Sequence, residues 1–229
     1  MQATNDLYRQ IYETPGHIKQ HKVVVAGVEY GQDKIVSLRV SGGLFAKNGP
    51  SVGGTVARQI DLILRSPGEI PRMASIRPYT RLVYGSQSTD WLPKGLFYID
   101  TRAYDPQNDL ITLHGYDNML KFEQTYLLEG DTGTWPRSAE SVARDIASRI
   151  GITLDERCSF SPAYQVQYPG DYTMRELLSH IAIANTGNWT ITDSGKLRLV
   201  RLADLAAEES YLVDEYGYSI SFGGDLILV

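Results

Sequence analysis

The run ARQIDLIL at residues 57–64 alternates polar and apolar side chains and decides the fold class of the region around it. Three runs with the same alternation follow, with only turns between them: TRLVY at 80–84, GLFYID at 95–100 and LITLHGY at 110–116. A period of two is typical of β-strands that bury one face and expose the other to water. Residues 53–126 are therefore predicted to form a series of β-strands. No set of catalytic groups stands out among them.

Composition and charge narrow the class of protein. The chain has 229 residues, of which 42% are hydrophobic and 21% charged, with 22 Lys and Arg against 27 Asp and Glu. These values fit a globular protein of one large or two smaller domains. Because Lys and Arg form no block and the net charge is −5, we expect no sequence-specific binding of nucleic acid.

The sequence also lacks the marks of membrane insertion and export. No run approaches the roughly 18 apolar residues that a transmembrane helix requires. The polar, charged N-terminus is unlike a signal peptide. We therefore expect that this chain does not insert into a membrane and that it is made and assembled in a cytoplasm.

Residues 1–20 are predicted to form an N-terminal helix or arm, with a short helix at 6–13 that ends at the following Pro-Gly pair. A first strand is predicted at 21–28. The run at 35–40 is predicted to return beside this strand as its hairpin partner.

The glycine-rich segment at 42–54 lacks the pattern of a phosphate-binding loop. Such a loop needs Gly-Lys-Ser/Thr at the start of a helix, so that backbone N–H groups face the phosphates. Here Lys47 precedes Asn-Gly-Pro, and a predicted strand follows. We therefore expect a mobile β-loop at 42–54 and no phosphate site.

After Tyr126 the pattern changes to a mixture of helices and strands. The predicted order is a helix, a strand, a second helix and a hairpin, at residues 138–150, 164–168, 173 onward and 188–200. The first helix is amphipathic, with Ala, Val and Ile side chains on one face. Thr173 and Glu176 have the spacing of a capping box at the start of the second helix.

The side chains that carry chemistry show no recognisable site. No histidine has a Cys or carboxylate partner at metal-ligand spacing; the four are His17, His21, His114 and His180. The single cysteine, Cys158, excludes an intramolecular disulfide and is interpreted as structural. No Gly-x-Ser-x-Gly motif occurs, whereas a carboxylate pair stays open because such residues meet only in space. We predict no catalytic, cofactor-binding or metal site, no cofactor and no enzymatic activity.

Several segments together resemble a known family. They are VGGTVARQIDL at 52–62, IPRMA at 70–74, WLPKGLFYIDT at 91–101, LHGYDNML at 113–120, TMRELL at 173–178, GNW at 187–189 and GKLRL at 195–199. In order and texture they are similar to the tail hub proteins of bacteriophages and prophages of Gram-positive hosts, over most of residues 5–200. This family has no catalytic signature, so no active-site residues carry over.

The resemblance implies a structural subunit of a baseplate hub or tail tip, located in the virion tail and assembled in the bacterial cytoplasm. It implies a homotrimeric ring that continues the tail tube and connects it to the spike. The partners would then be further copies of the chain, the tube, the spike and the end of the tape measure. By composition, the loops at 42–54 and 85–90 are candidates to reach a neighbouring subunit.

The expected fold class is α+β, mainly β. The resemblance implies a tail-tube-like antiparallel β-barrel over residues 21–128, followed by a mixed α/β module over 129–202. Residues 203–229 would begin a further β segment. Because the chain ends on an apolar, strand-like run, we expect it to be truncated, with part of that segment missing.

Two alternatives stay open. A distal tail protein or carbohydrate-binding module of the same particle would be favoured by exposed Trp91 and Trp135 with tyrosines in a groove, because sugars stack on aromatic faces. A cell-wall hydrolase would need two convergent carboxylates, or a Cys and a His, in one pocket.

Overall fold

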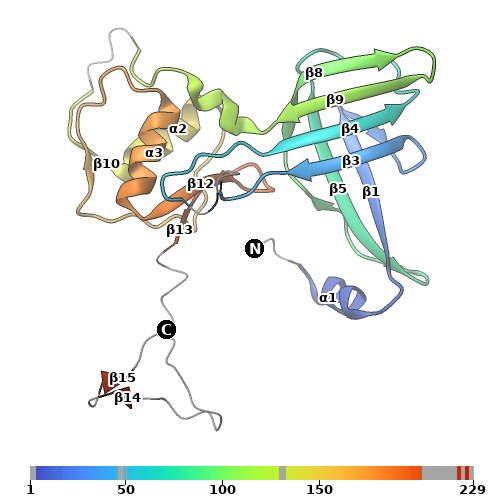
Figure 1. Ribbon diagram of the computed structural model, residues 1–229, viewed down its shortest axis with the longest axis horizontal. Coiled ribbons are helices and arrows are strands. Elements are labelled where there is room, and N and C mark those ends of the chain that lie inside the picture. Colours follow the sequence, from blue (N-terminus) through green and yellow to red (C-terminus); the bar gives the residue numbers. More distant parts are fainter. Residues whose placement is uncertain are drawn as a thin grey trace.

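A computed structural model of the chain describes residues 4–45, 49, 51–128 and 133–202, and the backbone of two short strands at 221–222 and 225–226. Two units lie side by side (Figure 1): the strand unit, from α1 to β9, and the helix unit, from η1 to β13. Each unit has its own cluster of buried apolar side chains. The fold is therefore mainly β, with antiparallel sheets and some helices, as the sequence predicts.

The strand unit is a nine-stranded sheet preceded by a helix. Its elements are α1 (Asp6–Glu13), β1 (Ile18–Val25), β2 (Val28–Tyr30), β3 (Ile35–Ser41), β4 (Gln59–Arg65), β5 (Ser75–Tyr84), β6 (Gln87–Ser88), β7 (Leu92–Pro93), β8 (Phe97–Asp105) and β9 (Leu110–Tyr116). The alternating run at 57–64 forms β4, in which Ile60, Leu62 and Leu64 are fully buried. The period of two therefore sets the buried face, as predicted.

The sheet curls around its core. Its strand order is β2-β1-β5-β8-β9-β4-β3, with antiparallel pairing throughout. Side chains of β1, β4, β5, β8 and β9 meet in one buried cluster. The end strands β2 and β3 follow each other in the chain, but no backbone pairing joins them in the described ranges. The sheet is therefore open and curled, and the closed barrel expected over 21–128 is not observed.

The prediction that residues 35–40 pair with 21–28 is wrong. β1 ends in a tight turn at Ala26 and Gly27, which have φ angles of 52° and 84°, and it pairs with β2. β3 pairs instead with β4, across the loop at 42–54. A period-two pattern fixes which face of a strand is buried and leaves its partner undetermined.

The N-terminal helix α1 is confirmed where the sequence places it. The side chain of Asn5 caps it and accepts a hydrogen bond of 2.9 Å from the N–H of Tyr8. α1 packs against β5 at the far end of the long β1–β5 pair (Figure 1), where its Ile11 is buried.

The helix unit contains η1 (Asn118–Glu123), β10 (Arg137–Ser138), α2 (Ala139–Arg149), β11 (Gln165–Val166), α3 (Met174–Ala184), β12 (Gly187–Ile191) and β13 (Leu197–Arg201). The helices α2 and α3, the strand β11 and the β12–β13 hairpin are the elements predicted from the sequence, whereas η1 and β10 were not predicted. The capping box is present: Thr173 Oγ1 accepts from the N–H of Glu176 at 3.1 Å, and Glu176 accepts from the N–H of Thr173 at 2.8 Å. β12 and β13 form the predicted hairpin.

The core of the helix unit begins earlier than the predicted boundary between 128 and 129. Met119, Phe122 and Tyr126 are fully buried in it, together with side chains of α2, α3, β12 and β13. Residues 118–126 therefore contribute their apolar side chains to the helix unit. The division into independently folding domains stays a prediction.

Most of residues 203–229 lies outside the described residues. Two short strands there, β14 (Ser221–Phe222) and β15 (Asp225–Leu226), form an antiparallel pair. The prediction of a further, truncated β segment stays a prediction.

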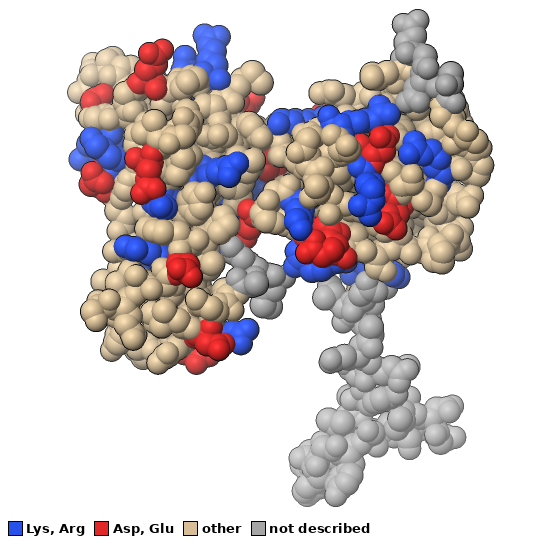
Figure 2. All heavy atoms as spheres, turned by 180° about the vertical axis from the view of Figure 1, so that it is seen from behind, with Lys and Arg blue, Asp and Glu red and all other residues tan. Residues whose placement is uncertain are grey.

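Charged side chains of both signs are spread over both units on the face in Figure 2, without a single basic patch. The longest described helices, α2 and α3, have 11 residues each. A bilayer-spanning helix needs about 20 mostly apolar residues, so no helix in the described ranges is long and apolar enough to span a membrane.

Two isoleucines of α3 give a matched test of the helix-unit core. Ile181 is fully buried and Ile183 is 55% exposed. We expect Ile181→Ala to lower the free energy of unfolding by about 2–5 kcal/mol, because it leaves a cavity, and Ile183→Ala to lower it by less than about 1 kcal/mol. Urea unfolding followed by tryptophan fluorescence measures both. Equal losses would contradict the described packing of α3.

Candidate functional site

The two units are joined by a seam in which residues 51–57, just before β4, run along β12. Thr55 pairs with Trp189 in a parallel bridge. The N–H of Gly53 donates to the carbonyl of Gly187 at 2.9 Å, and the N–H of Trp189 donates to the carbonyl of Gly54 at 2.7 Å. We call residues 51–57 the strap, because they run along the edge of β12 and pair with it at Thr55.

Buried polar side chains of the helix unit hold the strap. Asn188 is fully buried; its Oδ1 accepts from the N–H of Gly54 and its Nδ2 donates to the carbonyl of Ser51, both at 2.6 Å. The hydroxyl of Ser179 donates to the carbonyl of Gly53 at 2.8 Å. The loop at 42–54 was expected to be mobile, but its residues 51–54 are fixed on the chain's own helix unit.

The glycine pair of the strap allows its close approach. Gly53 has a φ of +88°, and a Cβ there would lie 2.6 Å from Cγ1 of Ile183 on α3. A Cβ on Gly54 would lie 3.1 Å from Oδ1 of Asn188. A larger residue at Gly53 would therefore force the Ile183 side chain or the strap to shift.

Arg175 on α3 ties the strap to η1. Its guanidinium donates to the carbonyl of Thr55 at 2.8 Å and to the carbonyl of Met119 at 2.9 Å. Its Nε lies 2.7 Å from Oε1 of Glu123. One planar side chain thus holds two backbone segments. Arginine is suited to this role because its guanidinium presents several N–H donors in a fixed plane.

Asp117 caps η1 and also contacts Arg58, the residue directly after the strap. Its carboxylate accepts from the N–H of Met119 at 3.0 Å and from the N–H of Arg58 at 3.2 Å. Burial raises the pKa of this carboxyl from 3.8 to about 6, and the two N–H groups and the cations Arg58 and Arg175 limit the rise. The group is therefore costly to ionise in the folded chain.

Arg58, which directly follows the strap, reaches toward the turn between β12 and β13. Its guanidinium lies 2.7 Å from Oδ1 of Asp193 and donates to the carbonyl of Lys94 at 3.0 Å. It also lies 5.7 Å from the centre of the Phe97 ring. This half-buried ion pair is a second crossing point between the units.

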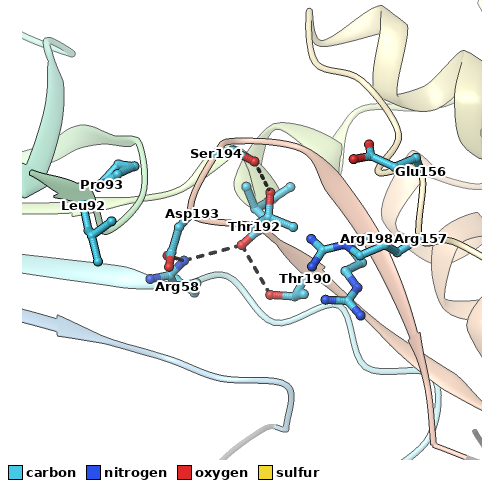
Figure 3. A pocket seen from close by; sticks show the side chains of 11 residues that line it. Arg58, Leu92, Pro93, Glu156, Arg157, Thr190, Thr192, Asp193, Ser194 and Arg198 are labelled. Atoms are coloured by element: carbon cyan, nitrogen blue, oxygen red, sulfur yellow. Dashed lines mark hydrogen bonds and ion pairs between the residues drawn. The ribbon is translucent and has the colours of Figure 1, made fainter. Parts of the chain in front are cut away.

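A cleft of about 660 Å³ opens beside this ion pair (Figure 3). We call it the seam cleft; its lining comes from both units and comprises Arg58, Leu92, Pro93, Glu156, Arg157, Thr190, Ile191, Thr192, Asp193, Ser194 and Arg198. In Figure 3, Arg58 and Asp193 lie on one side, Arg157, Arg198 and Glu156 on the other, with Thr190 between them. The volume is within the range of ligand pockets, about 300–1,000 Å³.

Both carboxylates of the seam cleft are engaged by cations. Asp193 pairs with Arg58, and Oε2 of Glu156 lies 2.7 Å from Nζ of Lys196. Hydrogen bonds from Arg157 lower the pKa of the neighbouring Asp155 carboxyl to about 2. The arrangement suits binding of an anion better than proton transfer, because a general acid or base works best with a pKa near the working pH.

The histidines and the cysteine that the sequence offers for metal binding or catalysis form no cluster in the part of the chain that the structure describes. No group of three or more His, Cys, Asp and Glu that could hold a metal occurs among the residues described. His114 Nδ1 lies 2.7 Å from Oδ1 of Asp61, its direct cross-strand neighbour. Burial raises the pKa of the Cys158 thiol, whose Sγ accepts from the N–H of Leu199 at 3.2 Å. This agrees with a structural role for Cys158.

The two tryptophans considered for sugar binding are both partly buried. The Trp91 ring centre lies 4.5 Å from the Arg81 guanidinium and 4.9 Å from Nζ of Lys22. Trp135 makes edge contacts with Tyr126 and Tyr168, at 6.3 and 6.4 Å between ring centres. Cations therefore flank Trp91, and tyrosines flank Trp135.

Sequence reasoning missed the polar residues of the seam, namely Arg58, Asp117, Arg175, Asn188 and Asp193. Two signals were available. The Gly53–Gly54 pair indicates a close backbone approach, and Asp117 precedes η1 as a cap residue would. Neither signal identifies the partner, which lies more than 50 residues away in the sequence.

Comparison with known proteins supports the fold. No protein-family model and no curated protein matches the sequence. Among solved structures, the 43 kDa tail protein of prophage MuSo2 from Shewanella oneidensis matches with a TM-score of 0.52 and 16% identity, over 81% of this chain and 56% of that chain. A tail protein from Neisseria meningitidis MC58 matches with a TM-score of 0.49 and 12% identity, over 90% and 56%.

The match to the MuSo2 tail protein shows a shared fold, because 16% identity is too low to show more. This chain spans about half of the length of the two tail proteins, 56% of each.

Two glycines with positive φ give a matched test of the strap. A Cβ on Gly53 meets Ile183, whereas a Cβ on Gly68, which has a φ of +73°, meets nothing within 4 Å. We expect Gly53→Ala to lower the free energy of unfolding by about 1–2 kcal/mol more than Gly68→Ala, because overpacking adds to the backbone strain that both share. Urea unfolding measures the difference, and equal losses would show that the strap is not closely packed on α3.

Asp117 predicts a pH dependence of stability. Its pKa is raised in the folded chain to about 6 from 3.8, so the folded state binds this proton more tightly than the unfolded state. Its contribution is therefore most favourable below about pH 4 and is lost as the pH rises through about 6, by at most about 3 kcal/mol. Asp117→Asn should remove this slope.

Urea unfolding of both proteins from pH 4 to 7 measures the difference in slope. All other carboxyl groups are common to the two proteins and cancel in it. A difference that is flat across this range would contradict the raised pKa.

Proposed function

We propose that this chain is a structural subunit of a phage or phage-like tail, in the baseplate hub or tail tip. The observation that carries the proposal is the shared fold: 81% of the chain matches a prophage tail protein. The sequence resemblance to tail hub proteins supports it independently. The Gram-positive host is part of this proposal and follows from the sequence resemblance alone.

In this proposal three copies form a ring that continues the tail tube and connects it to the spike, within the virion tail. The curled sheet supports a role of this kind, because its end strands β2 and β3 each have one edge without a backbone partner in the described ranges. Such edges pair readily with strands of another chain. Tube, spike and the end of the tape measure are the proposed partners, and assembly takes place in the bacterial cytoplasm.

The proposed role is mechanical, with no enzymatic activity and no cofactor. The polar groups at the seam support it, because they hold backbone segments together. Arg175 and Asp117 each contact two segments of the chain, and Asn188 makes two hydrogen bonds to the strap. The hydrolase alternative gains no support from the seam cleft, whose two carboxylates are ion-paired.

Carbohydrate binding is a second candidate function, and one groove of the helix unit favours it. The groove has a volume of about 220 Å³ and lies between β11 and α3. Tyr168 and Tyr172 line it and are 67% and 46% exposed, and Gln165, Gln167 and His180 line it as well. Exposed aromatic rings beside amide groups are suited to stack on and hydrogen-bond a sugar.

The oligomeric state distinguishes the two functions. We expect light scattering of the purified chain to give three times its mass of 25.6 kDa at high concentration, with rings in negative-stain images. A chain that stays monomeric and binds N-acetylglucosamine oligomers saturably would favour the carbohydrate-binding alternative. In that case Tyr168→Ala should abolish binding, and Tyr104→Ala, at an exposed tyrosine of β8, should not.

A further inference from the structure

The seam cleft carries more positive than negative side chains on its walls. Three arginines line it, Arg58, Arg157 and Arg198, against the two carboxylates of Glu156 and Asp193. The whole chain, by contrast, has a net charge of −5. The net charge of the residues that line the cleft is therefore positive, opposite in sign to that of the whole chain.

Arg198 differs from the other two arginines of the cleft. Arg58 pairs with Asp193 at 2.7 Å, and Arg157 contacts both carboxylate oxygens of Asp155, each at 2.7 Å. The Nε of Arg198 is buried, and no described residue accepts a hydrogen bond from it. A buried donor without an acceptor costs free energy. The Nη groups of the same guanidinium make no hydrogen bond or ion pair with a described residue either, and these are the groups that a ligand in the cleft would contact.

The hydroxyl group of Thr190 lies beside Arg198 in the lining of the cleft. Thr190 is its direct cross-strand neighbour in the β12–β13 hairpin, on the face opposite the buried pair of Trp189 and Leu199. The Thr190 hydroxyl lies 3.5 Å from the carbonyl of Ile191, longer than a good O–H···O hydrogen bond. Figure 3 shows Thr190 between the arginines of the two sides. The guanidinium groups and the Thr190 hydroxyl thus all line the seam cleft.

The chemistry of these donors suits a carboxylate. A guanidinium matches the two oxygens of a carboxylate or phosphate with parallel hydrogen bonds. Glu156 and Asp193 at the edges of the cleft would repel a nucleic-acid backbone, in which charges follow every few ångströms. A peptide can place single carboxylates between them.

We propose that the seam cleft binds a carboxylate side chain of an acidic peptide segment of another tail protein, through Arg198 and Thr190. This rests on the proposed function only in assigning the partner to the tail. The peptide segment would bind where the two units meet and contact both of them, so that its binding also holds the units together.

The test uses the full chain and the peptide acetyl-Gly-Glu-Gly-amide, which carries a single carboxylate, titrated by calorimetry and by NMR of the arginine Nε–H groups. We expect saturable binding that weakens with salt and shifts the Arg198 resonance. Arg198→Gln should weaken binding roughly tenfold or more. Arg65→Gln, at an exposed arginine on the far end of β4, is the matched control and should leave binding unchanged.

Thr190→Val provides a second variant of nearly equal volume, which we expect to weaken binding severalfold without unfolding the hairpin.

Inorganic phosphate and a single-stranded oligonucleotide are titrated in parallel. Tighter binding of either than of the peptide would overturn the assignment to a carboxylate. Equal affinity of the Arg198→Gln and Arg65→Gln proteins, or no saturable binding, would overturn the site. A ring without peptide binding would refute this inference alone, whereas peptide binding by a chain that never assembles would refute the proposed function alone.

Discussion

The parallel pairing of the strap with β12 is the constraint on which the arrangement of the two units depends. A two-stranded ribbon such as β12–β13 is marginal in water by itself. The strap extends it on one side through Thr55 and Trp189, and Leu154 extends it on the other through Leu197. Trp189 is fully buried within this small sheet, and its indole N–H donates to the carbonyl of Leu178 at 2.6 Å. Separating the units would therefore leave backbone groups unpaired.

Buried polar groups define the geometry of the seam at a cost in stability. Asp117 is the clearest case, because burial raises the pKa of its carboxyl to about 6. The same carboxylate accepts hydrogen bonds from two backbone N–H groups, one directly after the strap and one in η1. An apolar residue would avoid the burial cost but leave both donors unpaired. The carboxyl therefore fixes the orientation of η1 relative to the strap more than it stabilises the fold.

Local features of the fold could be predicted from the sequence, and its long-range partners could not. The alternation in β4, the capping box of Thr173 and Glu176, and the β12–β13 hairpin each depend on neighbouring residues, and the structure confirms them. The partner of β3 and the crossing from Asn188 to the strap depend on segments far apart in the chain. The pattern of a strand fixes its buried face and does not choose among edges of similar character. The candidate site was missed for the same reason, because the seam exists only once both units have folded.

The seam differs from an ordinary contact between domains, which usually leaves relative motion possible. Its hydrogen bonds join backbone groups of the strap to β12, and the side chains involved, such as Asn188, are short and buried. Long exposed side chains could follow a moving partner, whereas short buried ones cannot without losing their hydrogen bonds. The backbone segments that carry Arg58 and Arg198, on the two sides of the seam cleft, are therefore joined before any ligand arrives. Such preorganisation lowers the entropic cost of binding, so the contact that joins the units also shapes the cleft between them.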